Sequence, residues 1–146
     1  MTNIRPASAG DLARVAEILI FNYRLNFYPI FQCDEFYFGD LQVPDLMEEY
    51  KSSLDHIWVY DDGVVKGFIL VEDGEIKKLF VEPVLQGRGI GAQLLCYAVE
   101  ELDADCLWAL EKNTRAIAFY RRHGFVPTGE RKPEEDTEEY LIRLVR

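Results

Sequence analysis

Three glycines at alternate positions constrain this chain more than any other feature. They lie in the stretch QGRGIG, residues 86–91, between a run typical of a β-strand and a run typical of a helix. Alternating glycines let successive backbone N–H groups point at one anion without interference from a Cβ atom. A helix that starts at such a loop adds its positive end. The stretch therefore predicts a turn that binds phosphate groups.

The letters of this loop fit two phosphate-binding patterns and one alternative without a ligand. Residues 87–92, GRGIGA, satisfy the dinucleotide fingerprint G-x-G-x-x-G/A. When Gln86 is included, the run reads Q-x-x-G-x-G, which is a different phosphate-binding loop. The third interpretation is a glycine-rich connector that binds nothing. The order of the elements around the loop decides between them.

The first half of the chain predicts an antiparallel meander. A short strand near residue 4 precedes apolar residues with helical spacing between Leu12 and Ile20, and residues 47–54 suggest a second helix. Three strand-like runs follow, HIWVY, VVKGFILV and EIKKLFVEP, and two Asp-Gly turns join them. The sheet is therefore already antiparallel when the chain reaches the glycine loop.

The second half predicts one crossover and an antiparallel finish. Apolar residues from Ile90 to Leu102 mark one helix face, and CLWALEK is the next strand. NTRAIAFYRRHG is typical of a helix that stops at Gly124, and FVPTGER and EYLIRLV are typical of two final strands. A dinucleotide fold instead repeats βαβ units and places its glycine loop after the first strand. The element order therefore favours the loop that begins at Gln86.

Length and composition are those of a soluble protein with one domain, residues 1–146. No apolar run approaches the roughly 20 residues of a membrane span, and the formal charge of −10 argues against nucleic-acid binding. The first residues lack the form of a signal peptide, so we expect a cytoplasmic protein. Cys33, Cys96 and Cys106 have no paired spacing, and we expect reduced packing residues rather than metal ligands or a disulfide.

Two segments resemble the GNAT superfamily of acyl-CoA-dependent N-acetyltransferases. KKLFVEPVLQGRGIGAQLL resembles the coenzyme A motif of that family, and LEKNTRAIAFYRRHGF resembles the strand–Asn–helix segment that follows it. The resemblance extends from IRPASAGDL to the final strand. It implies an α/β (α+β) fold of GNAT type, with a mixed, mostly antiparallel sheet of six to seven strands and about four helices. The central strands would splay around coenzyme A.

The resemblance also implies roles for individual residues. The edge of the strand before the loop would pair with the pantetheine arm of the coenzyme, and the loop itself would bind the pyrophosphate. Asn113 matches a polar residue that contacts the pantetheine, and Tyr120 matches a tyrosine near the coenzyme sulfur. The strand and loop residues that match the motif are Leu79, Phe80, Val81, Gln86, Gly87, Arg88, Gly89, Ile90 and Gly91.

The chemistry of a phenol supports the implied role of Tyr120. Acyl transfer to an amine expels a thiolate, and a phenol with a pKa of about 10 can donate a proton or a hydrogen bond to it. The structural alternative is a core aromatic on a buried helix face. Asn113 has an alternative as well, because Asn is a favoured residue at the N-cap of a helix.

Glu75 is the main candidate for the general base that the attacking amine needs. It heads the strand EIKKLFV, at a position where some relatives place a glutamate that acts through water. Strand alternation predicts that Glu75 shares a face with Leu79 and Val81. The alternative is a turn carboxylate after EDG. Other relatives carry a glutamate where this chain has Trp108, and Glu111 is a further candidate.

The aromatic run at residues 21–38 lies where this family builds its acceptor site. Aromatic rings combined with Asp34 and Glu35 suit an organic cation, and the alternative is a lid or helix pair packed on the sheet. The acidic run KPEEDTEEY, residues 132–140, predicts a solvated hairpin turn, with a border of the acceptor cleft as the alternative. The aromatic residues expected to contact the substrate are Tyr23, Phe27, Tyr28 and Phe31.

The resemblance implies an enzyme with acetyl-CoA as cosubstrate and no metal. We expect transfer of the acetyl group to a primary amine of a small molecule or peptide, by direct attack in a ternary complex. The alternative is a non-catalytic acyl-CoA-binding or sensor module on the same fold. Tyr120 favours the enzyme, because a binder needs no proton donor at the sulfur. A monomer or homodimer is expected, without nucleic-acid or membrane partners.

Overall fold

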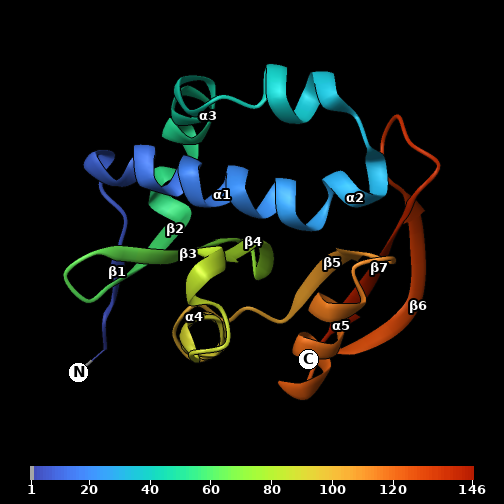
Figure 1. The fold of residues 1–146 in the computed structure, drawn as a ribbon. Helices are drawn as coiled ribbons and strands as arrows, with labels where there is room; N and C mark the ends of the chain where they lie inside the picture. Colours follow the sequence, from blue (N-terminus) through green and yellow to red (C-terminus); the bar gives the residue numbers. More distant parts are fainter. Residues whose placement is uncertain (1) are drawn as a thin grey trace.

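A seven-stranded sheet forms the centre of the molecule (Figure 1). The computed structural model describes residues 2–146, and the strand order is β1-β2-β3-β4-β5-β7-β6. Every neighbouring pair is antiparallel except β4 and β5, which run parallel. The expected mixed, mostly antiparallel sheet is therefore confirmed. The strands are β1 (Ile4–Pro6), β2 (Ile57–Asp61), β3 (Val65–Glu72), β4 (Glu75–Val81), β5 (Cys106–Leu110), β6 (Val126–Pro133) and β7 (Tyr140–Val145).

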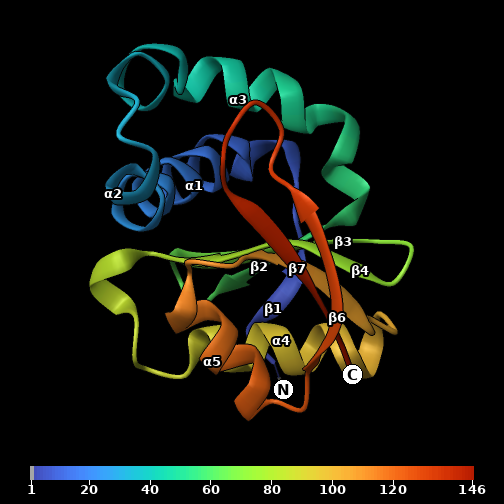
Figure 2. The same ribbon diagram turned by 90° about the vertical axis from the view of Figure 1, so that its right-hand side faces the viewer.

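Helices cover both faces of this sheet. α1, α2 and α3 lie on one face, and α4 and α5 lie on the other (Figures 1 and 2). Short 3-10 turns occupy 9–11, 51–56 and 83–85, and a π-helical turn occupies 35–40. No helix within residues 2–146 combines the length and the apolarity that a bilayer crossing requires. The α-helices are α1 (Leu12–Asn26), α2 (Tyr28–Phe31), α3 (Val43–Tyr50), α4 (Ile90–Glu101) and α5 (Thr114–Arg122).

The core consists of two apolar clusters, one on each face of the sheet. Phe68 and Ile69 are neighbours in β3, and both have 0% of their surface exposed. Phe68 belongs to the cluster beneath α1, together with Leu19, and Ile69 belongs to the cluster beneath α4, together with Leu94. Because successive side chains of a strand point to opposite faces, β3 anchors both layers.

β4 and β5 separate soon after they begin. Glu75 is in register with Cys106, and Ile76 is in register with Leu107, but the pairing stops there. β4 remains paired with β3 up to Val81, and β5 remains paired with β7 along its whole length. Each strand is thus held at its outer edge while the inner edges diverge. The expected splay of the central strands is confirmed.

A β-bulge in β4 changes which side chains share a face. The register with β3 shifts after Ile76, so that Lys77 is an additional residue without a partner in β3. As a result Ile76, rather than Glu75, lies on the face of Leu79 and Val81, against the cluster beneath α4. The prediction that Glu75 shares a face with Leu79 and Val81 is wrong, because simple alternation fails across a bulge.

Two of the three cysteines are not packed in the interior. Cys33 and Cys96 are exposed, and Cys106 is half-buried. The expectation of three packed cysteines is therefore wrong for the first two. Cys33 lies in the segment between α2 and the π-helical turn, and Cys96 lies on the outer side of α4.

Candidate functional site

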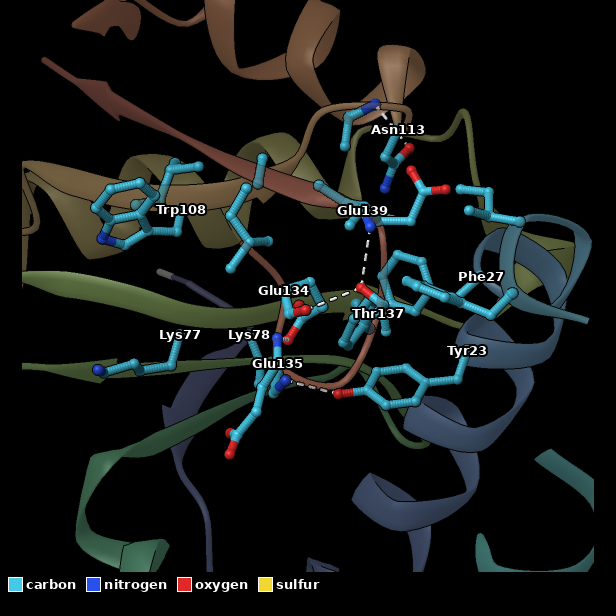
Figure 3. Close-up of a pocket in the computed structure, with 18 of the residues that line it drawn as sticks. Tyr23, Phe27, Lys77, Lys78, Trp108, Asn113, Glu134, Glu135, Thr137 and Glu139 are labelled. Carbon is cyan, nitrogen blue, oxygen red and sulfur yellow. Dashed lines mark hydrogen bonds between the residues drawn. The ribbon is translucent and has the colours of Figure 1, made fainter. Parts of the chain in front are cut away.

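Two clefts meet where β4 and β5 separate. The large cleft, of about 880 Å³, lies between α1, α2 and the turn that joins β6 to β7 (Figure 3). The small cleft, of about 390 Å³, lies between the end of β4, the glycine loop and α5. The junction of the clefts is formed by residues that line both of them, which are Leu79, Phe80, Asn113, Ala116 and Tyr120.

The glycine loop gives the small cleft an open backbone surface. Gly87 and Gly89 both have a φ of 84°, in the left-handed region that favours glycine. An added Cβ would meet no atom within 4 Å at Gly87, and only the Gln93 side chain at 4.0 Å at Gly89. Gly89 is the N-cap of α4, so the first N–H groups of this helix face outward without intrahelical partners. The loop therefore suits an anion, as predicted.

Two arginines that the sequence analysis missed supply positive charge to the small cleft. Arg115 and Arg122 line it from α5, whereas Arg88 is exposed and is not among the lining residues. His123 lines it as well, and its Nδ1 lies 2.8 Å from the carbonyl oxygen of Phe119. No carboxylate within residues 2–146 lines this cleft. The available signal was the seven-residue spacing of the arginines, which places both on one helix face.

Asn22 is a third lining residue of the small cleft that the sequence analysis missed. It lies in α1 with 1% of its surface exposed, and its Nδ2 donates to the carbonyl oxygen of Val81 over 2.8 Å. Its Oδ1 accepts a hydrogen bond of 2.9 Å from Nε2 of Gln86. A polar residue within an otherwise apolar helix face was the signal that could have found it.

Tyr120 lies at the junction with its ring buried and its hydroxyl unpaired. The side chain is 9% exposed and packs edge-on against Phe119 and Phe125. No hydrogen bond joins the hydroxyl to another residue of the described chain. Burial raises the pKa of this hydroxyl above its usual range, so it stays protonated at neutral pH. It can therefore donate a hydrogen bond to an anion that forms at the junction.

Asn113 caps α5 and borders both clefts. Its Oδ1 accepts a hydrogen bond of 3.3 Å from the backbone N–H of Ala116, which is an N-cap interaction. The alternative interpretation as an N-cap is therefore confirmed. Asn113 also lines both clefts. The second predicted role, a contact with pantetheine, is therefore compatible with its role as a cap.

Three of the four predicted aromatic residues line the large cleft. Tyr23 reaches it from α1, Phe31 reaches it from α2, and Phe27 is the residue between the two helices (Figure 3 labels Tyr23 and Phe27). Tyr28 is not among the lining residues, because its hydroxyl donates to Asp34 and its ring packs against the ring of Phe38. The structure thus does not bring Tyr28 into the candidate site.

The acidic turn between β6 and β7 is an exposed hairpin turn, as predicted, and it also borders the large cleft (Figure 3). Two lysines of β4 lie opposite: Lys78 donates to the Tyr23 hydroxyl over 2.6 Å, and Lys77 lies 3.4 Å from Glu75. Carboxylates outnumber lysines by five to two among the lining residues, which favours a cationic ligand. The five carboxylates belong to Glu134, Glu135, Asp136, Glu138 and Glu139.

The candidate bases lie apart from the junction. Glu75 lines neither cleft, and Glu111 is engaged by Arg131 at 3.1 Å on the exposed surface. Trp108 lines the large cleft, and the Nζ of Lys132 lies 4.2 Å from the centre of its ring. Within residues 2–146 no group of three His, Cys, Asp or Glu side chains is arranged to hold a metal ion.

A match to a protein-family model shows which family this chain belongs to. The model described as an acetyltransferase (GNAT) domain matches residues 53–127, which run from the 3-10 turn before β2 to the start of β6. This chain belongs to the GNAT acetyltransferase family. The matched residues include β4, the glycine loop, α4 and α5, and hence most of the small cleft. The expectation of an acyl-CoA-dependent acetyltransferase is confirmed at the level of the family.

Two proteins with similar sequences are named as N-acetyltransferases. The peptidyl-lysine N-acetyltransferase YiaC of Escherichia coli is 28% identical over 124 residues, which cover 84% of this chain and 82% of the relative. The peptidyl-lysine N-acetyltransferase YjaB of Salmonella typhimurium is 30% identical over 92 residues, or 61% of this chain. That match spans 63% of the relative, slightly less than two thirds of its length.

Solved structures share the fold. The apo form of YjaB from Escherichia coli superposes with a TM-score of 0.75 at 22% identity, covering 97% of this chain and 95% of that one. The PaiA N-acetyltransferase from Thermoplasma acidophilum, solved in complex with coenzyme A, superposes with a TM-score of 0.63 at 20% identity, covering 96% of each chain. The GNAT fold expected from the sequence is confirmed.

Proposed function

We propose that this chain transfers an acetyl group from acetyl-CoA to the side-chain amine of a lysine in a peptide or protein, by direct attack in a ternary complex. The observation that carries the proposal is the junction at Tyr120, where a cleft lined by arginines meets a cleft lined by carboxylates. Family membership supports the reaction class, and two relatives named peptidyl-lysine N-acetyltransferases support the acceptor.

Coenzyme A fits the residues of the small cleft. The open backbone at Gly87 and Gly89 accommodates a pyrophosphate that a Cβ atom would obstruct, and Arg115 and Arg122 offset its charge. The unpaired inner edge of β4, beyond Ile76, offers backbone groups to the amides of pantetheine. A structural neighbour that was solved in complex with coenzyme A supports the use of this cosubstrate.

The residues at the junction can assist the departure of a thiolate. Acetyl-CoA supplies the acetyl thioester when it is bound. The protonated hydroxyl of Tyr120 donates a hydrogen bond where the sulfur leaves, and the surrounding rings of Phe119 and Phe125 restrict water. Backbone N–H groups of β4 that face the separation can donate to the thioester oxygen.

The large cleft suits an amine that arrives as a cation. The acidic turn attracts an ammonium group, and Tyr23 and Phe27 supply aromatic surface for the aliphatic part of a lysine side chain. The amine must lose a proton before it attacks, and Glu75, acting through water, stays a prediction for this step. A non-catalytic acyl-CoA-binding module would explain the small cleft but would need no acidic cleft at Tyr120.

Turnover with defined acceptors tests the proposal. The purified protein is mixed with acetyl-CoA and either a lysine peptide, the same peptide with alanine at that position, or a set of small amines. Release of free thiol and the mass of the peptide are followed together. We expect thiol release that depends on the lysine and yields an acetylated peptide. Binding of coenzyme A without turnover on any amine would instead support the sensor module.

A further inference from the structure

We propose that Asn22 is a positioning residue for the coenzyme: it fixes the last carbonyl group of β4 and the first residue of the glycine loop in one geometry. The inference rests on the proposed use of the small cleft for coenzyme A. Asn22 belongs to α1, outside the residues that the family model matches, and its role follows from its contacts alone.

Both the nitrogen and the oxygen of the Asn22 side-chain amide form hydrogen bonds with other residues of the protein. Nδ2 donates to the carbonyl oxygen of Ile18 over 2.9 Å and to that of Val81 over 2.8 Å. Oδ1 accepts from Nε2 of Gln86 over 2.9 Å. A buried amide is costly unless it is hydrogen-bonded, so these contacts hold the three segments in one arrangement.

The carbonyl group of Val81 needs such a partner. The N–H of the next residue, Glu82, donates to the carbonyl oxygen of Lys66 over 2.9 Å, on the β3 side. Because backbone groups of successive strand residues point to opposite edges, the Val81 carbonyl points toward the separation between β4 and β5. No strand pairs with β4 there, and the side chains of Asn22 and Gln86 replace the missing partner, the latter at 3.3 Å.

The same contacts set the position of the glycine loop. Gln86 is the residue directly before Gly87, so a side chain held by Asn22 and Val81 fixes where the loop starts relative to β4. A loop that already has its bound geometry loses less conformational entropy when the ligand arrives. Asn22 therefore acts on the affinity for coenzyme A through Gln86 and Val81, without taking part in the chemistry.

α1 contacts β4 through two successive residues, one for each cleft. Asn22 holds the end of β4 beside the small cleft, and Tyr23 accepts a hydrogen bond from Lys78 in the large cleft. The two contacts are separate, so a change at Asn22 is expected to affect coenzyme binding and to leave acceptor binding intact.

Calorimetric titration of coenzyme A into Asn22→Leu tests the inference, because Leu keeps the approximate volume and removes the hydrogen bonds. We expect the Kd to rise about tenfold, the scale of one to two net hydrogen bonds. The KM for acetyl-CoA should rise in parallel, while kcat at saturating acetyl-CoA and the KM for the lysine peptide change less than about twofold. Gln86→Met, in the loop, should act in the same direction, and the double variant should fall short of additivity.

Val15→Ala is the matched control, because Val15 is a buried apolar residue of the same helix without polar contacts. It should lower the melting temperature and leave the Kd unchanged. If Asn22→Leu and Gln86→Met also bind coenzyme A like the wild type, the inference is overturned, whatever their melting temperatures. Wild-type protein that binds no coenzyme A would overturn the proposed function itself, which keeps the two failures distinct. If Asn22→Leu does not fold, Asn22→Ala, which removes the same three hydrogen bonds without adding volume, takes its place in the titration.

Discussion

The two clefts differ in what they are built from. The small cleft is largely backbone: a glycine loop, the first turn of α4 and the inner edge of β4, with arginines at its side. The large cleft is largely side chains: aromatic rings of α1 and α2 facing the carboxylates of the β6–β7 turn. Backbone N–H groups suit an anion of any kind, whereas aromatic and acidic side chains select a ligand by its shape and charge. This difference agrees with the proposal that the small cleft binds the cosubstrate and the large cleft binds the acceptor.

Removal of the Tyr120 hydroxyl should have the largest effect, because both clefts meet there. We expect Tyr120→Phe to lower turnover on the order of 100-fold, the scale of losing one general acid, with little change in coenzyme affinity. The loss should be smaller for a thioester with a more acidic thiol. Turnover at saturating amine measures both effects. Tyr97→Phe on α4, outside both clefts, is the control. If Tyr120→Phe turns over as fast as the wild type, Tyr120 is only a packing residue.

A side chain added to the glycine loop should impair coenzyme binding in the small cleft and leave the large cleft unaffected. Gly89→Val places a branched side chain where an added Cβ would meet only the Gln93 side chain, at 4.0 Å, so we expect coenzyme affinity to fall by about one to two orders of magnitude. The φ of 84° adds a conformational cost of about 1–2 kcal/mol. Gly63→Val carries a comparable cost at a φ of 118°, in the β2–β3 turn away from both clefts. If calorimetry shows equal coenzyme affinities for the two variants, the glycine loop does not bind the pyrophosphate.

Neutralisation of the acidic turn should impair the large cleft alone. We expect Glu135→Gln combined with Glu138→Gln to lower kcat/KM for a lysine peptide about three- to tenfold at low salt, and less at high salt. The KM for acetyl-CoA should not change. Glu100→Gln combined with Glu101→Gln on α4 removes the same charge elsewhere. A loss of equal size in both double variants would point to net charge rather than to the turn.

The smallest effect on activity should come from the Arg5–Asp11 pair, which lies away from both clefts. Hydrogen bonds from Arg5, 2.8 Å from Asp11, lower the pKa of this carboxyl to about 2. A depressed carboxyl pKa stabilises the fold above its unfolded value of about 4, and this contribution is lost as the pH falls through about 2. Asp11→Asn should therefore cost about 1–2 kcal/mol at pH 7, after allowance for the partly exposed Arg5, and almost nothing near pH 2.

Denaturant unfolding at several pH values measures this difference, with turnover at pH 7 as the second readout. Unchanged turnover in Asp11→Asn would separate fold stability from the clefts. A stability difference that persists undiminished at pH 2 would contradict the assignment of the effect to ionised Asp11.

The contrast between the clefts also explains how much the sequence could predict. The small cleft follows from local signals, because glycines at alternate positions mark a backbone conformation before any tertiary contact is known. Arg115, Arg122 and Asn22 escaped because they reach the cleft from other helices, and only the packing of these helices brings them to the loop. The meander was predictable as well, since two Asp-Gly turns fix the connections.

The large cleft was harder to predict because it depends on side-chain direction. The bulge at Lys77 reversed the face expected for Glu75, and no residue pattern marks a bulge reliably. Tyr28 lies in the same aromatic run as Tyr23 and Phe27, yet its hydrogen bond to Asp34 turns it away. The acidic run allowed two interpretations, a solvated turn and a border of the cleft, and only the fold, which brings the β6–β7 turn opposite α1, shows that both hold.

The central claim is that donor and acceptor meet at Tyr120 from two separate clefts. A bisubstrate compound, in which an acetyl bridge joins the sulfur of coenzyme A to the lysine amine of a peptide, tests it most directly by calorimetry. We predict binding on the order of 100-fold tighter than that of coenzyme A alone. Gly89→Val and the Glu135→Gln, Glu138→Gln double variant should each weaken it. Binding no tighter than that of coenzyme A, and insensitive to the acidic turn, would contradict the account.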